Sequence, residues 1–264
     1  FETWTDGELR HTRDARGVHW LTLNSPATFN ALGESMLQAL EQAIAGVAAD
    51  DAARAVVLGA EGKAFCAGQD LAEATDPNGP ALQDIVAKHY NPIILKIRAL
   101  EKPVIAAVNG VAAGAGANIA LACDLVIAKE SAAFIQAFSK IGLIPDSGGT
   151  FFLPRLVGAQ KALALMLTGE KVMAPEAEAM NMIYKAVSEE AFEQTVSNLA
   201  TQLAKMPTKA FGLTKKAVNA SFNQTLEEQL ILEEQLQTQA GQTHDFNEGV
   251  QAFLEKRSPE FKGH

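Results

Sequence analysis

The chain has 264 residues, 48% of them hydrophobic, which is enough for one large buried core in a globular protein of the α/β type. Its formal net charge of −9 at pH 7 argues against nucleic acid as a partner, because binding a phosphate backbone needs clustered Lys and Arg, although a few local cations can still hold an anionic ligand. Cys66 and Cys123 have neither metal-ligand nor disulfide-framework spacing and no apolar run suits a bilayer, so we expect a cytoplasmic protein with reduced thiols and no membrane partner.

Strands and helices alternate along the first half of the chain. Residues 18–23 predict a short buried strand that stops before Pro26, and apolar residues then recur at helical spacing at Leu37, Leu40, Ile44 and Val47. The pattern continues with a strand over residues 55–58, a helix over 85–100, a strand over 104–108, a helix of small residues over 119–122 and a strand over 125–128. This alternation predicts a largely parallel sheet covered by helices.

Two further segments bear on the organisation of the chain. Turn-forming residues crowd positions 75–80, which predicts either a mobile lid over a site or a plain connector. After Pro207 the pattern is helical, and Thr225 and Glu228 have the spacing of a capping box. We therefore expect a core over residues 1–205 and a helical module over residues 206–264.

Two turns rich in Gly and Ala, at residues 64–70 and 108–118, are the first candidate for chemistry. Small residues let the backbone approach a ligand, and two N–H groups from separate turns can form an oxyanion hole for a thioester carbonyl. The alternative is that these small residues only allow a helix to pack tightly against the sheet. Gly114 and Gly116 also resemble the start of a dinucleotide-binding motif, but Ile119 stands at its third glycine and no acidic residue follows at the required distance.

Asp146, in the run Pro145-Asp146-Ser147-Gly148-Gly149, is the isolated acid that could move a proton. It is either the N-cap of the following helix, which would keep it ionised, or a general base whose pKa is raised by an apolar pocket of Phe138, Ile141 and Leu143. The five histidines are scattered without nucleophile or metal spacing, so we expect no metal site. His89 either borders the pocket or is an ordinary surface histidine.

Several motifs in order along the chain resemble the crotonase (enoyl-CoA hydratase/isomerase) superfamily. They lie at residues 23–32, 65–71, 102–110, 123–124 and 148–150, so that the match covers nearly the whole chain. The resemblance implies an α/β fold, a spiral of ββα turns with a helical C-terminal trimerisation region, and assembly as a homotrimer or a dimer of trimers. It also implies an acyl-CoA substrate, with coenzyme A as part of the substrate and no separate cofactor.

The resemblance also assigns roles to residues in the two turns. The oxyanion-hole donors would be the backbone N–H groups of Gln69 and Ala115. Enoyl-CoA hydratases of the family use two glutamates, and the matching positions here hold Asn118 and Phe138, which puts simple water addition in doubt. The substrate pocket is then expected to include Ala67, Gly68, Asp70, Gly114, Asn118 and Phe138.

Within the superfamily, residues 137–150 and 249–261 look most like the phenylacetate-pathway isomerases. These convert ring-1,2-epoxyphenylacetyl-CoA into its oxepin form and shift double bonds of enoyl-CoA from Δ3 to Δ2, and Asp146 stands at their catalytic aspartate. The alternatives are an enoyl-CoA hydratase, a catalytically silent CoA binder, and a 4-chlorobenzoyl-CoA dehalogenase, which would carry a tryptophan where this chain has Phe138.

Overall fold

The computed structural model describes residues 2–264 and contains two β-sheets. The larger sheet has the order β1-β2-β3-β4-β6-β8-β11, with β1 (Glu2–Asp6), β2 (Leu9–Arg13), β3 (Val18–Leu23), β4 (Ala55–Ala60), β6 (Val104–Val108), β8 (Leu125–Lys129) and β11 (Lys185–Val187). The smaller sheet has the order β10-β9-β7-β5, with β5 (Ala64–Cys66), β7 (Val111–Ala113), β9 (Ala133–Ile135) and β10 (Lys171–Met173). Strands from β3 to β11 in the larger sheet run parallel, as the alternating pattern predicted.

The chain passes repeatedly from the larger sheet to the smaller one and then into helices. After β4 and β5 come α2 (Leu71–Ala74), α3 (Leu82–Ile85), a π-helical turn (Val86–Tyr90) and α4 (Asn91–Ala99). After β6 and β7 comes α5 (Ala115–Ala122), and after β8 and β9 come a 3₁₀ turn (Ala137–Ile141), α6 (Gly149–Val157) and α7 (Ala159–Thr168). These three units confirm the expected spiral of ββα turns.

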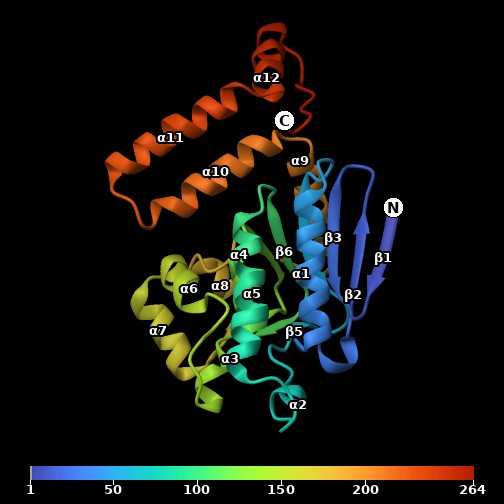
Figure 1. Ribbon diagram of the computed structural model, residues 1–264, viewed down its shortest axis with the longest axis vertical. Helices are drawn as coiled ribbons and strands as arrows, with labels where there is room; N and C mark the ends of the chain where they lie inside the picture. The colour runs from blue at the N-terminus through green and yellow to red at the C-terminus, as the bar shows by residue number, and fades with distance from the viewer. Residues whose placement is uncertain (1) are drawn as a thin grey trace.

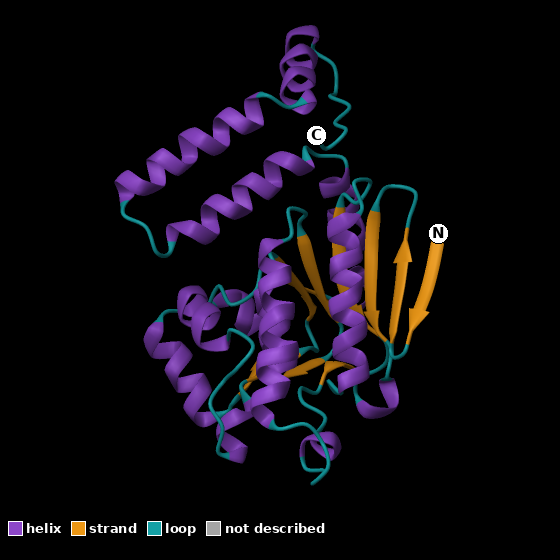
Figure 2. Cartoon of the chain, in the orientation of Figure 1, coloured by secondary structure: helices purple, strands orange, loops and turns teal. Residues whose placement is uncertain are grey.

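Helices cover both faces of the larger sheet (Figures 1 and 2). Side chains alternate between the faces of a strand, and in β4 Val56 and Leu58 join the core under α1 (Glu34–Ala49), α4 and α5. Val57 points the other way, into the core under α9 (Glu189–Ala204), where Phe192 and Val196 pack. Burial on both faces explains why this strand reads as a continuous apolar run.

The last three helices extend from one end of the core (Figure 1). They are α10 (Thr208–Ser221), α11 (Leu226–Gly241) and α12 (His244–Glu255), and α8 (Ala174–Ala179) lies in the core before them. Thr225 and Glu228 form the predicted capping box at the start of α11. A boundary between residues 205 and 206 would fall between α9 and α10, and stays a prediction. No helix within residues 2–264 is long and apolar enough to span a membrane.

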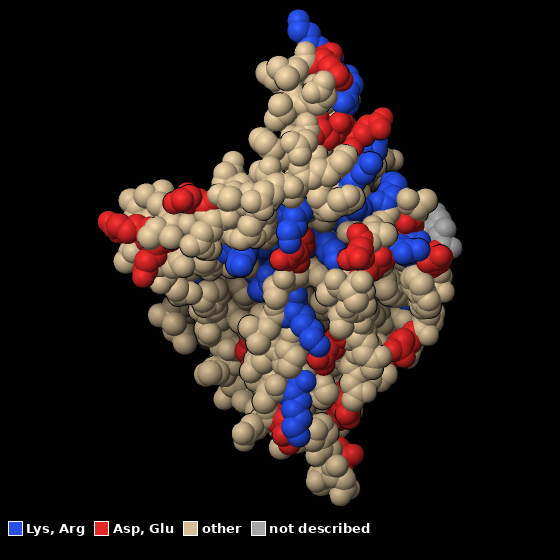
Figure 3. Space-filling view, turned by 45° about the horizontal axis from the view of Figure 1, so that its top comes forward, with Lys and Arg blue, Asp and Glu red and all other residues tan. Residues whose placement is uncertain are grey.

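Element ends differ from the sequence expectations in three places. The predicted helix at 85–100 starts at Leu82 and contains the π-helical turn, the helix at 119–122 starts at Ala115, and the strand at 55–58 continues to Ala60. The turn-rich residues 75–80 form a loop between α2 and α3, and whether it acts as a lid stays a prediction. Acidic and basic side chains are interspersed on the face shown in Figure 3, where the C-terminal helices meet the core.

Candidate active site

The first Gly-rich turn leaves one backbone donor unused. Gly68 adopts φ +91°, and its carbonyl accepts from the Leu32 N–H at 2.7 Å, while the Asp70 N–H donates back to Leu32 at 3.2 Å. Because the N–H and C=O of one peptide point in opposite directions, the Gln69 N–H points away from Leu32. It donates to no acceptor within residues 2–264.

The second turn places another free donor beside the first. Gly114 has φ +53° and is the N-cap of α5, so Ala115 is the first helical residue and its N–H lacks an intrahelical acceptor. A β-carbon on Gly68 would lie 2.8 Å from the Ala113 oxygen and 3.6 Å from the Ala115 nitrogen, which shows how closely the two turns approach. The two N–H groups assigned from the sequence therefore come from adjoining turns.

The packing interpretation of these glycines is also correct at two positions. A β-carbon on Gly116 would lie 2.5 Å from the Cys66 sulfur, and one on Gly110 would lie 2.1 Å from the Lys63 oxygen. Cys66 is fully buried, and burial raises the pKa of its thiol to about 12, so it is no nucleophile at neutral pH. Gly116 and Gly110 thus serve packing, whereas Gly68 and Gly114 supply the left-handed backbone that the turns need.

Tyr90 secures the first turn from the end of the π-helical segment. Its buried hydroxyl donates to the Gln69 side-chain oxygen, and the Gln69 amide donates to the Leu32 carbonyl at 3.3 Å. Burial, and then the nearby Asp146 carboxylate, raise the pKa of Tyr90, so the phenol stays a donor. Sequence analysis considered the adjacent His89 instead, because nothing in a helical pattern shows which neighbour faces the site.

Asp146 lies at the start of α6 but does not cap it. The N-cap is Gly148, and the half-buried Asp146 side chain accepts instead from the Ser147 hydroxyl at 3.0 Å, so the N-cap interpretation is wrong. Ser147 is buried and has φ +49°, an uncommon conformation for a residue with a β-carbon. Burial raises the pKa of Asp146 and the Ser147 hydrogen bond lowers it, with burial the stronger effect.

The predicted apolar surroundings of Asp146 are only partly correct. Phe138 is buried, but Ile141 is 57% and Leu143 39% exposed, so neither forms a closed apolar wall. Ile141 is the last residue of a short 3₁₀ turn that is capped by Gly142 with φ +74°, and Leu143 follows the cap. The raised pKa of Asp146 comes from its burial.

Asn118 connects the acid to the second turn. It is fully buried in α5, and its amide donates to the Asp146 main-chain oxygen at 2.8 Å, while its own oxygen accepts from Gln136 at 2.8 Å. A β-carbon on Gly149 would lie 2.3 Å from this amide nitrogen, so Asn118 packs directly against the turn. One helix therefore supplies the Ala115 N–H and also holds the main chain of the acid.

The other predicted pocket residues have different surroundings. Phe138 lies near Gly114, because a β-carbon added to Gly114 would be 3.8 Å from the Phe138 ring. Asp70 caps α2 by accepting from the backbone N–H of Ala72 at 2.9 Å, and Ala67 is exposed and donates its N–H to the Phe29 carbonyl at 3.0 Å. Within residues 2–264, no three His, Cys, Asp or Glu side chains are grouped to hold a metal ion.

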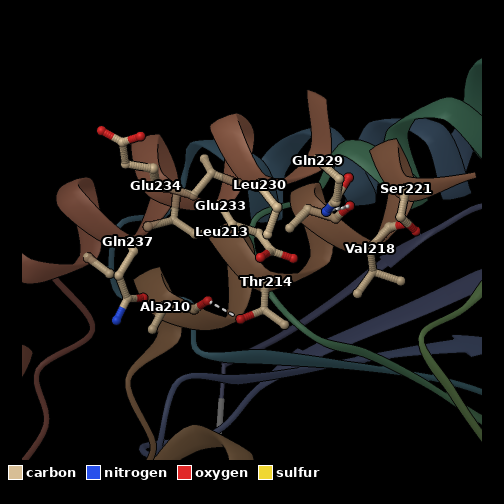
Figure 4. A pocket seen from close by; sticks show the side chains of 13 residues that line it. Ala210, Leu213, Thr214, Val218, Ser221, Gln229, Leu230, Glu233, Glu234 and Gln237 are labelled. Atoms are coloured by element: carbon tan, nitrogen blue, oxygen red, sulfur yellow. Dashed lines mark hydrogen bonds between the residues drawn. The ribbon is translucent and has the colours of Figure 1, made fainter. Parts of the chain in front are cut away.

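A groove of about 760 Å³ lies apart from these residues, between α10 and α11 (Figure 4). Leu213 and Val218 of α10 and Leu230 of α11 contribute apolar side chains, and Glu233 adds a carboxylate. Gln229 crosses between the helices, donating to the Ala217 carbonyl at 3.2 Å. No residue of either turn or of the Asp146 segment lines this groove.

Comparisons with known proteins show which proteins this chain resembles. Residues 13–264 match the family model described as enoyl-CoA hydratase/isomerase. The chain is 47% identical to the 1,2-epoxyphenylacetyl-CoA isomerase of Escherichia coli (strain K12) over 251 residues, covering 94% of this chain and 96% of the relative. It is also 47% identical, over 249 residues with the same coverage, to a probable enoyl-CoA hydratase of Rhodobacter capsulatus. The crystal structure of a putative enoyl-CoA hydratase/isomerase from Mycobacterium abscessus aligns with a TM-score of 0.92 at 37% identity, covering 97% of this chain and all of that one.

Proposed function

The chain belongs to the enoyl-CoA hydratase/isomerase family, and from this premise we propose that it isomerises acyl-CoA thioesters with two backbone donors and one carboxylate. The observation that carries the proposal is the uncharged surroundings of Asp146. Asn118 and Phe138 occupy the positions at which the family's hydratases carry glutamates, and the Asn118 amide donates to the Asp146 main-chain oxygen and accepts from Gln136.

The proposed reaction is a double-bond shift in a 3-enoyl thioester. The thioester oxygen accepts from the N–H groups of Gln69 and Ala115, and the Asp146 carboxylate removes a proton from C2. The C2–H electrons form the C1=C2 bond of a dienolate and the carbonyl π electrons move onto the oxygen, whose negative charge the two donors stabilise by several kcal/mol, ~3 for a single donor. Asp146 returns the same proton to C4, so one base serves both steps. When C4 takes up the proton, the C3=C4 electrons form the new C4–H bond, the C1=C2 electrons become the C2=C3 bond, and the carbonyl re-forms.

Hydration is the second candidate, because one of the two relatives at 47% identity is described as a probable enoyl-CoA hydratase. Water addition to a 2-enoyl thioester requires a base for the water and an acid for C2. Asp146 can supply only one of these two groups. The Asn118 amide is bound to the Asp146 main-chain oxygen and to the Gln136 side chain. This chemistry favours isomerisation over hydration.

For the acyl group we propose ring-1,2-epoxyphenylacetyl-CoA, rearranged to its oxepin form. The support is the identity to the isomerase of Escherichia coli and the aromatic side chain of Phe138 close to the Gly114 turn. We expect coenzyme A to be part of the substrate, with no separate cofactor. With this substrate, the Asp146 carboxylate that serves the double-bond shift would assist the expansion of the ring.

We further propose that the protein acts in the cytoplasm as a homotrimer or a dimer of trimers. The C-terminal helices expose large apolar side chains, including Leu226 (70%) and Phe253 (82%). The groove between α10 and α11 adds an unfilled apolar surface. Such surfaces suit contacts between copies of one chain.

The test is product analysis by mass spectrometry, with a 3-enoyl-CoA, a 2-enoyl-CoA and the aromatic epoxide as substrates. We expect isomers of unchanged mass from the first and third substrates and no product from the second. Asp146→Asn should lower turnover about 10²–10⁴-fold, whereas Asp51→Asn, at an exposed acid before β4, should leave it unchanged. A product heavier by one water from the 2-enoyl-CoA would establish hydration instead. If none of the three substrates gives a product, the remaining interpretation would be a catalytically silent CoA binder.

A further inference from the structure

A cavity at the end of the core opposite the candidate active site is lined by three arginines. It has a volume of about 350 Å³ and lies between the β2–β3 turn, the loop before β4, the end of α9 and the C-terminal tail. Its charged residues are Arg13, Asp14, Arg16 and Arg54.

Two of these arginines are paired with acids. Arg16 forms a salt bridge with Asp14, and Arg13 contacts Asp50 at 3.0 Å and Glu2 at 2.9 Å. The Asp14 carboxylate also accepts from the Val18 N–H and the Trp20 indole, so it has no capacity left for a second cation.

Arg54 is the exception. It is 8% exposed, and one terminal nitrogen donates to the carbonyls of Met206 at 2.8 Å and Phe261 at 3.4 Å. Its Nε is buried without a hydrogen-bond partner, and within residues 2–264 no carboxylate lies within salt-bridge distance of its guanidinium. Asp245 acts on it from farther away and raises its pKa, while burial lowers it. A buried cation with an unused donor is costly unless an anion completes its surroundings.

The cavity is separate from the two Gly-rich turns. Gly17 and Arg54 immediately precede β3 and β4, at the amino ends of these parallel strands. The Gly68 turn follows β5, which begins beyond the carboxyl end of β4, and a strand of this length spans about 20 Å. In Figure 1 the C-terminal tail and β5 accordingly lie at opposite ends of the core.

We propose that this cavity binds a phosphate-type oxyanion, held by the Arg54 guanidinium with Arg13 and Arg16 at its rim. Arginine suits this ligand because its fork of N–H donors matches the oxygens of a phosphoryl group. Three arginines lining one cavity favour a dianion over a single carboxylate. The bound ion would join the β2–β3 turn, the end of α9 and the tail at Phe261, which all line the cavity.

The test is calorimetric titration of the full chain with inorganic phosphate at constant ionic strength. We expect saturable binding in the millimolar range, at least about tenfold weaker in Arg54→Lys, which keeps the charge but loses the fork, and similarly weaker in Arg16→Gln. Arg155→Gln, at an exposed arginine in α6, is the control and should bind phosphate as the parent does. Circular dichroism checks that each variant is folded. If Arg54→Lys does not fold, the phosphate affinity of Arg16→Gln is the test of the proposal.

Two further titrations define the ligand and the site. Acetate should bind at least about tenfold more weakly than phosphate, and saturating coenzyme A should leave phosphate binding unchanged. Absence of saturable binding by the parent protein, equal binding by parent and variants, equal binding of acetate, or displacement by coenzyme A would each overturn the proposal.

Discussion

Ser147 is the residue that most directly adjusts the chemistry of Asp146. Its hydroxyl donates to the carboxylate at 3.0 Å and stabilises the ionised form, while burial of Asp146 acts in the opposite direction. Ser147 has a positive φ and lies in a turn that Asn118 contacts. The Asn118 side-chain amide donates to the main-chain carbonyl of Asp146 in this turn. Sequence analysis passed over Ser147, because nothing in the run of residues 145–150 shows which small residue faces the acid.

Removing the Ser147 hydroxyl should shift the dependence of kcat/KM on pH. The hydrogen bond lowers the pKa of Asp146, so Ser147→Ala should raise it, and the acidic limb of the profile, on which the base is lost by protonation, should move to higher pH. Ser147→Gly also lacks the hydroxyl but relieves the strain of φ +49°. Both variants should show the same shift, and a shift in Ser147→Gly alone would assign the effect to the backbone instead of the hydroxyl.

The sequence predicted single residues that lie within a recognisable motif. It did not predict the positions of residues in irregular backbone segments. Asp146 and the donors at Gln69 and Ala115 were predicted, and their turns are in place. Ile141 was misplaced because a 3₁₀ turn has no apolar periodicity that distinguishes an inner from an outer side. Tyr90 was missed because its contact with Gln69 joins residues 21 positions apart.

At the scale of elements, the contact between α5 and β5 sets the position of the oxyanion donors. Gly116→Ala would place a methyl group 2.5 Å from the buried Cys66 sulfur, so we expect a loss of about 1–3 kcal/mol in the free energy of unfolding. Gly46→Ala, in α1 with no atom near the added carbon, should instead raise it by about 0.5–1 kcal/mol. Urea denaturation measures both, and a Gly116→Ala protein as stable as the parent would contradict the packing described.

Strands β2 and β3 carry a chain of hydrogen bonds that should make stability depend on pH. His11 contacts His19 at 2.8 Å, and His19 contacts Asp50 at 3.1 Å. Burial and the charge of His19 lower the pKa of His11 to about 4, and burial also lowers the pKa of His19 although Asp50 opposes this. Arg13 beside Asp50 adds positive charge that further disfavours protonation of His19.

The sign follows from proton binding. The unfolded chain binds protons at the ordinary histidine pKa, whereas the folded chain does so only at lower pH, so stability is full above about pH 6.5 and falls towards pH 4. Because His11 is only half-buried, we expect a loss of about 1–2 kcal/mol over this range. Urea denaturation should show a flatter pH dependence for His11→Gln but not for His89→Gln. Equal slopes for both variants and the parent would contradict this role.

The long strands and helices could be predicted, and the short strands could not. β4 and β6 appear in the sequence as apolar runs, and the structure contains them with small changes at their ends. β5, β7 and β9 have three residues each, too few for any alternation to be visible, so the second sheet entered only through the family resemblance.

At the scale of the whole molecule, the proposed assembly would cover apolar side chains that the C-terminal helices expose. Phe253 and Leu254 on α12 are 82% and 69% exposed, and Leu226 on α11 is 70% exposed. Large exposed apolar patches mark interaction sites, so we expect the single chain to be one component of an oligomer. The helical pattern after Pro207 predicted the helical module but could not show which faces it leaves uncovered.

Light scattering after size-exclusion chromatography tests the assembly. With a chain of 28.1 kDa, we expect a particle of three or six chains. A lysine at an interface breaks it, so Phe253→Lys should give smaller particles, whereas Gln251→Lys, exposed on the same helix, should not. A parent protein that elutes as a single chain would contradict the proposed assembly.

The most direct test of the central claim is a crystal structure of the Asp146→Asn protein with a bound 3-enoyl-CoA. We predict that the thioester oxygen lies about 2.7–3.1 Å from the backbone nitrogens of both Gln69 and Ala115, and that the side chain at position 146 faces C2 and C4 of the acyl group. A thioester oxygen bound away from these two nitrogens, or a side chain at position 146 facing solvent, would contradict it.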